Sequence, residues 1–459
     1  MKETTASRRI SRRNFLRNSS AMAGMAATAP YVGWSSTASG AAPSKDLRFA
    51  CLGAHGKARR NIADMATVPN TTMVAVAEVD SGRLDFVNEQ SPKTKIYKDW
   101  RVLLEKEAAG LDAVIVSTPD HMHAPMAMTA MQAGLNVYCE KPLTRTVFEA
   151  RALRLFAEQN GIITQMGNQR SQHTANQTVV HALRNRLVGT VKEIHCLQDK
   201  SWGSMEALVD SGAPKPKGLD WDLWIGGSPM RPFMAEHFHP FAWRSRLNYG
   251  SGNLGDMGCH IFHPWFLGLQ PGSPLTVESL GKGPANAESW PTDVRVTWEF
   301  PGSKVSGGKK FNVTWHDGGQ QPPAHVAKAV GGVENVPKSG SIVIGTKGTL
   351  VSPHGGSTIP TLYVDGSLQK DAVEIIPGAE RHHLDFANAV RGENGGKSPL
   401  SHFGHGARMT EAVLLGTCAI RTPGMKLRWD ADALKFTNSE VASSFVRNEY
   451  REGWQVAGL

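Results

Sequence analysis

The chain has 459 residues, of which 40% are hydrophobic and 20% charged, and its formal net charge is +9. This composition is typical of a globular protein, and the length exceeds what one hydrophobic core usually supports, so we expect two domains. Six basic residues and one acid lie within residues 1–41, and the rest of the chain has no basic run. We therefore expect no nucleic-acid partner.

A pair of arginines near the N-terminus gives the first specific signal. The segment 11–17 reads SRRNFLR, and a stretch rich in Ala, Gly and Ser follows over residues 21–40. This order resembles the bacterial twin-arginine signal. We therefore expect residues 1–41 to be a signal peptide, which the twin-arginine export machinery recognises when it exports the protein to the periplasm. The apolar stretch is too short and too polar for a stable membrane anchor. An uncleaved basic N-terminus is the alternative.

The cysteines are odd in number, widely spaced and without a CxxC pair. We expect buried free thiols rather than a disulfide framework. They are Cys51, Cys139, Cys196, Cys259 and Cys418.

Short apolar runs alternate with helical segments in the first part of the chain after the leader. Strands are expected at residues 47–52, 72–79, 111–117, 136–139 and 162–166. Helices are expected from the glycine turn after the first strand to about residue 65, at 124–133 and at 148–159. This alternation predicts an α/β fold with a doubly wound parallel sheet of the Rossmann type, in a domain that spans residues 42–165.

The second part of the chain has longer strand patterns joined by turn-rich links. Strands are expected at residues 191–201, 275–281, 293–300, 310–315 and 341–350, and helices at 381–391 and 404–421. We expect an α+β domain over residues 166–459 with a large, open, mostly antiparallel sheet. The open face of that sheet is a candidate contact for a homo-oligomer, a dimer or a tetramer. A long loop, 203–250, is rich in aromatic residues, which argues against disorder.

A glycine turn follows the first strand. In a dinucleotide-binding fold, glycines here let the backbone approach the pyrophosphate, but the copy Gly53-Ala54-His55-Gly56 has histidine at the second glycine position. Glu78 ends the second strand, where a carboxylate can hold the adenosine ribose and favour NAD over NADP. An ordinary turn and a solvated acid are the alternatives.

Two polar motifs follow the next strands, at the edge where ligands of open parallel sheets bind. Residues 117–123 read STPDHMH, and residues 140–143 read EKPL. Lys141 in the second motif places a cation where it can hold or polarise a substrate hydroxyl.

Together these motifs resemble the Gfo/Idh/MocA family, named for glucose–fructose oxidoreductase and inositol dehydrogenase. The resemblance continues through residues 167–169, 221–224, 250–260, 315–319 and 427–430, and so covers essentially the whole mature chain. It implies an NAD(P)-dependent oxidoreductase that acts on a hydroxyl of a sugar, cyclitol or glycoside, with NAD expected rather than NADP.

The resemblance also implies the site. Lys141 would be catalytic, with Asp256 and His260 as its partners. Because these two residues are four apart, they share one face of a helix, where the carboxylate can bond the histidine and favour its protonated form. A core histidine bonded to its helix neighbour is the alternative. The expected cofactor-binding residues are Gly53, His55, Gly56, Lys57, Glu78, Thr118, Pro119, His121, His123, Glu140, Lys141 and Gln169. The expected substrate-binding residues are Lys141, Trp243, Arg244, His260 and His263.

The second domain is rich in histidine and tryptophan. His263 and His316 depart from the family pattern and, with His237, His239 and His260, they raise the question of a zinc or manganese site. We assign no metal ligand, because none of their spacings is diagnostic, and sugar hydroxyls are the alternative partners. Five tryptophans are candidates for a sugar-stacking face or for the core: Trp202, Trp221, Trp224, Trp243 and Trp265.

Export bears on the function, because free NAD is scarce outside the cytoplasm. We expect a tightly bound cofactor that is regenerated within the catalytic cycle. In one interpretation, the enzyme oxidises a sugar and reduces a second carbonyl compound. In another, the enzyme oxidises a glycoside transiently, eliminates its substituent, adds water and reduces the ketone again. The elimination needs a further acid/base, for which the candidates are His237, His239, His263 and His316. A non-catalytic sugar-binding protein is the third reading.

Overall fold

The computed structural model describes residues 46–354 and 358–459. The predicted signal peptide, residues 1–41, lies outside these ranges, so it stays a prediction. Within the described ranges, every helix is too short or too polar to cross a membrane.

A six-stranded parallel sheet forms the first layer of the fold, with the strand order β3-β2-β1-β4-β5-β6. The strands are β1 (Leu47–Leu52), β2 (Thr71–Ala77), β3 (Lys95–Tyr97), β4 (Ala113–Val116), β5 (Asn136–Glu140) and β6 (Thr164–Gly167). The helices between them are α2 (Lys57–Ala66), α3 (Asp85–Gln90), α4 (Trp100–Glu107), α5 (His123–Gln132) and α6 (Val147–Asn160). The order reverses between β1 and β4, as in a doubly wound Rossmann sheet, which confirms the predicted fold class.

Both faces of this sheet are covered, because alternate residues of its strands point to opposite sides. In β1, Ala50 and Leu52 join the core that α4, α5 and α6 complete. Phe49 and Cys51 point the other way, toward α2 and toward α11 (His382–Arg391). Helix α11 comes from the last quarter of the chain and contacts α2 and β1. The sequence predicted the helix but not its place on the first sheet.

A ten-stranded sheet forms the second layer, with the order β14-β13-β12-β11-β7-β10-β9-β8-β15-β16. Only the β7–β10 pair is parallel, so the sheet is mostly antiparallel, as predicted. Its strands are β7 (Val191–Gln198), β8 (Thr276–Ser279), β9 (Arg295–Phe300), β10 (Phe311–Asp317), β11 (Ser339–Gly345), β12 (Thr349–Pro353), β13 (Thr361–Val364), β14 (Ser367–Gln369), β15 (Leu427–Asp430) and β16 (Lys435–Phe436).

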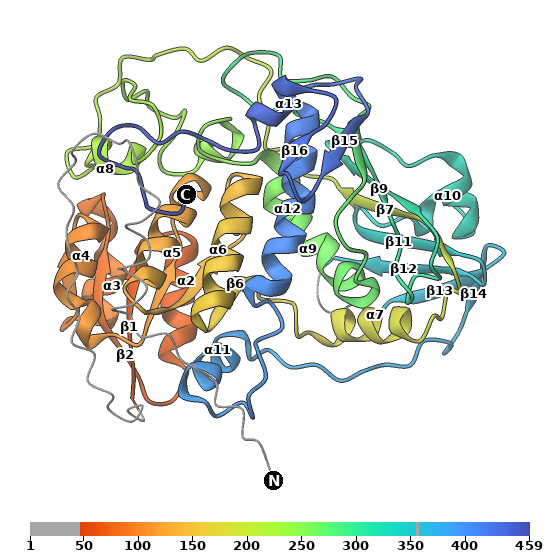
Figure 1. Ribbon diagram of the computed structural model, residues 1–459, viewed down its shortest axis with the longest axis horizontal. Helices are drawn as coiled ribbons and strands as arrows, with labels where there is room; N and C mark the ends of the chain where they lie inside the picture. Colours follow the sequence, from red (N-terminus) through yellow and green to blue (C-terminus); the bar gives the residue numbers. More distant parts are fainter. Residues whose placement is uncertain (1–45, 355–357) are drawn as a thin grey trace, which may run out of the picture. The chain divides into compact units, whose positions relative to one another are not determined.

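Helices cover one face of the second sheet. Alternation in β9 sends Val296, Trp298 and Phe300 into the core and leaves the residues between them partly exposed. Helix α12 (Phe403–Ile420) packs against both α6 and α9 (Gly252–Leu269), and so joins the two layers (Figure 1). The remaining helices of this part are α7 (Thr174–Arg184), α8 (Trp221–Ile225), α9 (Gly252–Leu269), α10 (Ala324–Ala329), α12 (Phe403–Ile420) and α13 (Glu440–Ser444).

The single strand predicted at residues 341–350 is wrong. The segment is a hairpin, in which β11 and β12 pair in antiparallel fashion with Ile344 opposite Thr349. The backbone N–H of Gly345 donates to the carbonyl of Gly348, which closes the turn. The apolar run was read across Thr346-Lys347-Gly348, although that tripeptide is a turn signal.

The aromatic-rich loop is ordered by its own small core. Trp224, Phe238, Trp243 and Tyr249 pack together, with Leu219 and Ile225 among them. The loop also reaches the first sheet, where Ser81 donates its backbone N–H to the Gly218 carbonyl and Asp80 forms a bridge with Leu219. The aromatic residues therefore order the loop, and its backbone at residues 218–219 joins it to the end of β2.

All five cysteines are buried free thiols, as predicted. Burial raises the pKa of Cys259 and of Cys418 to about 12, so these thiols stay protonated and behave as small apolar side chains.

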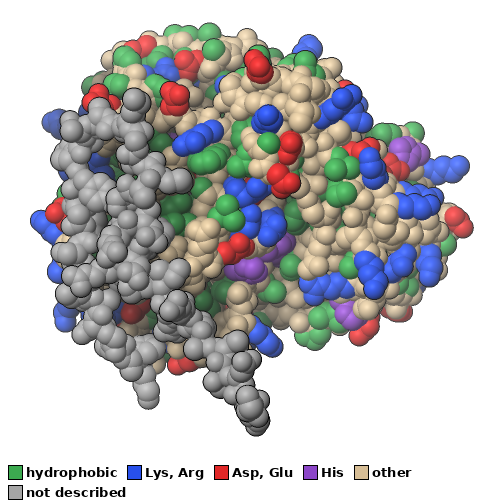
Figure 2. Space-filling view, viewed as in Figure 1, with side chains coloured by type: hydrophobic (Ala, Val, Ile, Leu, Met, Phe, Trp, Pro, Cys, Tyr) green, Lys and Arg blue, Asp and Glu red, His purple; other side chains and the backbone are tan. Residues whose placement is uncertain are grey.

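Charges of both signs are interspersed on the face shown in Figure 2. Lysine and arginine side chains lie among acidic and uncharged ones there, and several of them are neighbours at the right of the view.

Candidate active site

The glycine turn after β1 passes very close to the end of β4. Gly53 has a φ of +99°, and a Cβ at this position would lie 2.7 Å from the carbonyl oxygen of Ser117. Only glycine tolerates both the backbone conformation and this contact. The first glycine of the predicted motif is therefore required by the packing of the two strand ends.

Replacing Gly53 with alanine is expected to lower the free energy of unfolding by about 2 kcal/mol and to weaken NAD binding, because both the left-handed φ and the contact with Ser117 must be relieved. Thermal unfolding and nucleotide titration measure the two effects. Gly110→Ala is the control, because no atom lies within 4 Å of its would-be Cβ. Equal stability of the two variants would contradict this role of Gly53.

Helix α2 begins directly after the turn and has the features of an anion-binding terminus. Its N-cap, Gly56, has a φ of 63° and no side-chain cap, and a Cβ there would meet nothing within 4 Å. The uncapped N–H groups and the open space fit the pyrophosphate of a dinucleotide. His55 is exposed, and its Nδ1 lies 3.1 Å from Nη1 of Arg83.

Glu78, at the end of β2, is held by the backbone of the glycine turn. Its Oε2 accepts from the backbone N–H of Ala54 at 2.9 Å, and its Oε1 accepts from that of Asp80 at 3.1 Å. Burial raises the pKa of Glu78, and these backbone hydrogen bonds oppose the rise. The carboxylate thus fixes the backbone of the glycine turn, and its contact with the ribose stays a prediction.

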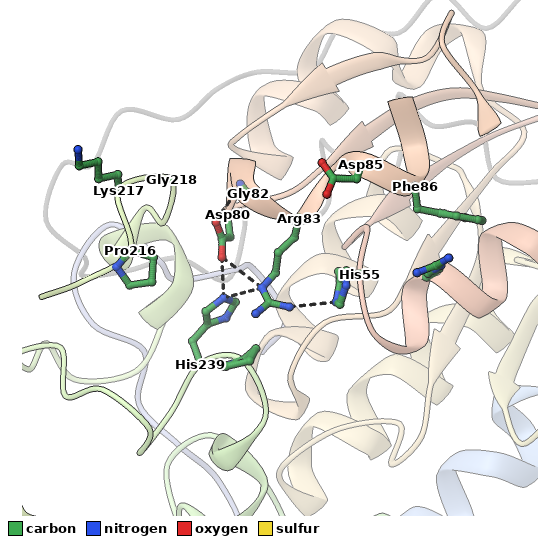
Figure 3. Close-up of a pocket in the computed structure, with 12 residues that line it drawn as sticks. His55, Asp80, Gly82, Arg83, Asp85, Phe86, Pro216, Lys217, Gly218 and His239 are labelled. Carbon is green, nitrogen blue, oxygen red and sulfur yellow. Dashed lines mark hydrogen bonds and ion pairs between the residues drawn. The ribbon is translucent and has the colours of Figure 1, made fainter. Parts of the chain in front are cut away.

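A pocket of about 540 Å³ opens beside the turn, at the carboxyl end of β2 (Figure 3). Asp80, rather than Glu78, is the strand-end acid that lines it. His239 Nε2 lies 2.8 Å from Asp80 Oδ2, and Arg83 Nε donates to the same oxygen at 3.2 Å. Residues 216–218 of the long loop complete the wall. The pocket lies at the edge of the sheet where the adenosine end of a dinucleotide belongs.

The motif after β4 divides into an accessible and a buried part. Thr118 and Pro119 are partly exposed, as cofactor contacts require. His123 is buried, with Nδ1 2.8 Å from the Pro142 carbonyl and Nε2 2.8 Å from the Thr118 carbonyl. His121 is also buried, and its Nε2 lies 3.0 Å from the Trp224 carbonyl. These two histidines hold loops together, so their prediction as cofactor contacts is corrected.

Glu140 organises the end of β5 from a buried position. Its Oε1 accepts from Asn61 Nδ2 at 2.9 Å and from Gln169 Nε2 at 2.7 Å. Lys57 Nζ lies 3.9 Å from the same oxygen and is about one third exposed. Glu140 therefore positions Gln169 and Lys57 at the carboxyl end of β5, where we expect the cofactor, and contributes to the site through these two residues.

Lys141 and Asp256 form the ion pair at the centre of the site. Lys141 Nζ donates to Asp256 Oδ1 at 2.6 Å and to the Asp256 carbonyl at 2.9 Å. Burial alone would raise the pKa of Asp256, but Lys141 and Arg244 outweigh it and hold that pKa below its ordinary range. Asp256 is therefore a permanent carboxylate that fixes the lysine ammonium.

His260 takes its orientation from Asn168. The Asn168 amide donates from Nδ2 to the Cys259 carbonyl at 3.0 Å, so its Oδ1 faces His260 Nδ1 at 2.7 Å. An amide oxygen only accepts, so Nδ1 must carry the proton and Nε2 keeps its lone pair. His260 is thus presented as a neutral base on its outward nitrogen.

The hydrogen bond expected between Asp256 and His260 is absent. Both carboxylate oxygens of Asp256 are used by other donors, Lys141 and Arg244 on Oδ1 and Trp202 Nε1 on Oδ2. The expected preference for protonated His260 is also wrong. Burial and the nearby Lys141 charge hold the pKa of His260 well below its usual value, and the opposing effect of Asp256 is smaller.

The aromatic residue that contacts the ion pair is Trp202 rather than Trp243. Trp202 donates to Asp256 at 2.8 Å and lies edge-on against the exposed Phe241. Trp243 is buried, and the Arg244 guanidinium stacks on it at 4.4 Å from the ring centre. Trp243 thus supports Arg244 from behind, which corrects its prediction as a substrate contact.

The other predicted histidines are engaged away from this ion pair. His263 is fully buried one turn along α9 from His260, with Nδ1 3.1 Å from His405 Nε2 on α12, so its prediction as a substrate contact is corrected. His316 lies against His195, and His237 lies against the Val209 carbonyl. His354, directly after β12, was not singled out by the sequence. Its ring lies tilted beside that of His260, with 5.5 Å between ring centres.

Two family models together match almost all of the described chain. The model for "Oxidoreductase family, NAD-binding Rossmann fold" matches residues 47–187, and the model for "Oxidoreductase family, C-terminal alpha/beta domain" matches residues 186–456. These matches confirm the NAD-binding Rossmann domain.

Curated relatives match over part of their length. An inositol 2-dehydrogenase of Saccharopolyspora erythraea is 32% identical over 28% of this chain and 39% of its own. A levoglucosan dehydrogenase of Pseudarthrobacter phenanthrenivorans is 25% identical over 36% of this chain and 34% of its own. The chain spans between a third and about half of the length of the first curated relatives it matches.

Solved structures share the fold over most of the chain. An inositol dehydrogenase homologue of Azotobacter vinelandii, in complex with NADH and myo-inositol, has a TM-score of 0.56 at 17% identity, covering 84% of this chain and 98% of its own. An aldose–aldose oxidoreductase of Caulobacter crescentus has a TM-score of 0.56 at 16% identity, covering 84% and 100%.

Proposed function

Since the chain belongs to the Gfo/Idh/MocA family of NAD-binding oxidoreductases, we propose that it oxidises a hydroxyl group of a sugar, cyclitol or glycoside. The observation that carries this proposal is the pairing of a fixed ammonium, Lys141, with a neutral imidazole, His260. When bound, NAD supplies the hydride acceptor. The glycine turn and the uncapped terminus of α2 would hold its pyrophosphate.

The protein's own residues divide the work of removing a hydroxyl proton. An ammonium has three N–H groups, and Lys141 donates two of them to Asp256, which leaves one to donate to the substrate oxygen. His260 accepts the hydroxyl proton on Nε2, and Asn168 holds the ring in place. Trp202 fixes the second oxygen of Asp256, so the carboxylate cannot turn away from Lys141.

The proposal predicts a wide pH plateau. His260 must be neutral to act, and its pKa is lowered, so kcat/KM is expected to stay flat through the range in which an ordinary histidine titrates and to fall only as the pH drops through the lowered pKa. Asn168→Asp retains the acceptor and adds a negative charge, so it is expected to move the acid limb to higher pH. An acid limb near the ordinary histidine pKa in the unaltered protein would contradict the assignment.

A direct assay tests the activity. The purified protein is incubated with NAD and a panel of sugars, cyclitols and glycosides, and reduction of the nucleotide is followed by absorbance. Reduction by at least one compound is expected, and it should disappear in a His260→Asn variant. Equal reduction by the two proteins would contradict the proposed base.

His354 favours a second candidate, redox-neutral cleavage of a glycoside. Elimination after transient oxidation needs another base, and His354 lies beside His260. Burial lowers the pKa of His354 to about 4, so it is neutral at physiological pH. This activity would release the substituent without net nucleotide reduction and exchange solvent deuterium into the carbon next to the oxidised one. Mass spectrometry of recovered glycoside and product tests it, with His354→Gln expected to abolish both exchange and release.

The leader supports a proposal about location. We propose that residues 1–41 direct export to the periplasm by the twin-arginine route, and that the enzyme retains its NAD through the cycle. We also propose that it forms a homo-oligomer through the part of the large sheet's open face that α10 leaves uncovered. Fractionation of cells that express the full chain, followed by size-exclusion chromatography of the exported form, tests these proposals.

A further inference from the structure

Three side chains form a compact cluster on the large sheet. Glu193 and His195 lie on β7, and His325 lies on α10. His195 Nε2 is 3.1 Å from Glu193 Oε2, and His325 Nε2 is 2.8 Å from Glu193 Oε1. One nitrogen or oxygen atom from each residue falls within 4.8 Å of the other two. We propose that Glu193, His195 and His325 bind a divalent transition-metal ion, with zinc the best match.

Packing places these three residues together. Alternation along β7 sends Ile194 and Cys196 into the main core and leaves Glu193 and His195 on the opposite face of the sheet. On that face, Val326 of α10 packs with Leu197 in a separate apolar cluster. The helix is therefore anchored beside β7 by apolar contacts, and its His325 is held over Glu193 although the side chain is 57% exposed.

The donor set suits zinc. Two imidazole nitrogens and one carboxylate oxygen are common zinc ligands, and three protein ligands leave a fourth position for water. On the partly exposed side of the cluster, water and ions can reach His325 and Glu193, whereas His195 is almost fully buried. The site thus has a rigid inner ligand and an accessible outer one.

His316 of β10 (Phe311–Asp317) contacts the ring nitrogen of His195 that does not face Glu193. Its Nε2 lies 3.0 Å from His195 Nδ1, and the two rings stack with 5.3 Å between centres. A metal on His195 Nε2 requires the proton on Nδ1, which then donates to His316. Second-shell partners of this kind fix the tautomer and orientation of metal-binding histidines.

Without a metal, the same atoms can form a hydrogen-bonded chain, in which both imidazoles donate their Nε2–H groups to Glu193. A metal takes the place of these two Nε2–H groups, so each neutral imidazole must then carry its proton on Nδ1. At acidic pH protons compete with the metal for both imidazoles, so binding weakens as the pH falls. The cluster shares no residue with the Lys141–Asp256–His260 site. The ion would fasten α10 to the sheet and act on stability rather than on hydride transfer.

The test uses the whole protein without a histidine tag, first stripped with a chelator. Zinc is then titrated in competition with a chromophoric chelator, and the metal retained after dialysis is measured by plasma mass spectrometry. We expect one zinc ion per chain, a higher melting temperature with zinc than without it, and weaker zinc binding at acidic pH. The cysteines do not compete, because all five are buried.

Variants separate this site from adventitious binding. His325→Gln is the main variant, because its exposed side chain leaves the core intact, and it is expected to weaken zinc affinity at least about tenfold. His195→Gln tests the buried ligand. His181→Gln is the matched control, since His181 Nε2 lies 3.0 Å from Glu374 Oε2 with no described third metal-ligand side chain beside it.

Two results would overturn the proposal. One is retention of less than stoichiometric zinc by the unaltered protein after dialysis against micromolar zinc. The other is an equal zinc affinity of the His325→Gln and His181→Gln proteins, which would show that surface histidines bind the metal without regard to the cluster.

Discussion

Replacing His260 with asparagine is expected to lower kcat by about a thousandfold, which lies within the range of general-base catalysis. The neutral Nε2 of His260 is the group placed to accept the hydroxyl proton, because Nδ1 is committed to Asn168. Asparagine keeps a polar side chain at this position but has no basic nitrogen. NAD affinity should stay unchanged, since the glycine turn and α2 lie on another part of the chain.

Stopped-flow or steady-state nucleotide reduction measures the effect on turnover, and nucleotide titration measures NAD binding. His173→Asn is the control, because His173 is a partly buried histidine paired with Glu380 at 3.2 Å and lies outside the ion pair. If His260→Asn retained turnover within a few-fold of the unaltered protein, another group would have to be the base.

Replacing Lys141 with methionine is expected to lower kcat/KM by about a hundredfold or more, as removal of a preorganised donor does. The change also leaves Asp256 with Arg244 as its only cationic partner among the described contacts. Breaking a buried ion pair from one side costs about 3–5 kcal/mol, and Arg244 should offset part of this loss. The variant is therefore expected to be both inactive and less stable.

A second substitution distinguishes catalysis from folding. The double variant Lys141→Met, Asp256→Asn removes the unpaired charge and is expected to regain stability in thermal unfolding but not turnover. Recovery of turnover in the double variant would mean that the single variant failed through misfolding, and the role of Lys141 as a substrate donor would be wrong.

Much of the fold follows from local pattern. The apolar run at residues 47–52 coincides with β1, and the alternation of strands and helices gives the parallel sheet. The hairpin at β11 and β12 was missed because three turn residues interrupt one continuous apolar run. The position of α11 on the first sheet was missed because it depends on packing between segments far apart in sequence, such as those of Phe49 and Phe386.

The site shows the same division between local and long-range information. The four-residue spacing correctly puts Asp256 and His260 on one helix, α9. The predicted hydrogen bond between Asp256 and His260 was wrong. Lys141 and Asn168, which follow strands distant in sequence, bind Asp256 and His260 instead. No local signal distinguishes Trp202, which contacts the ion pair, from the buried Trp243. His354 was likewise invisible, since only strand pairing brings it near His260.

The central claim is that this protein moves a hydride from a carbinol carbon to NAD while His260 takes the proton. Deuterium transfer tests it most directly: the protein is incubated with sugars and cyclitols deuterated at carbon, then denatured, and the released nucleotide is weighed by mass spectrometry. We predict a nucleotide that gains one deuterium in the unaltered protein and gains it about a thousandfold more slowly in His260→Asn. Bound nucleotide that takes up no deuterium from any compound would contradict the claim and favour a sugar-binding protein without catalysis.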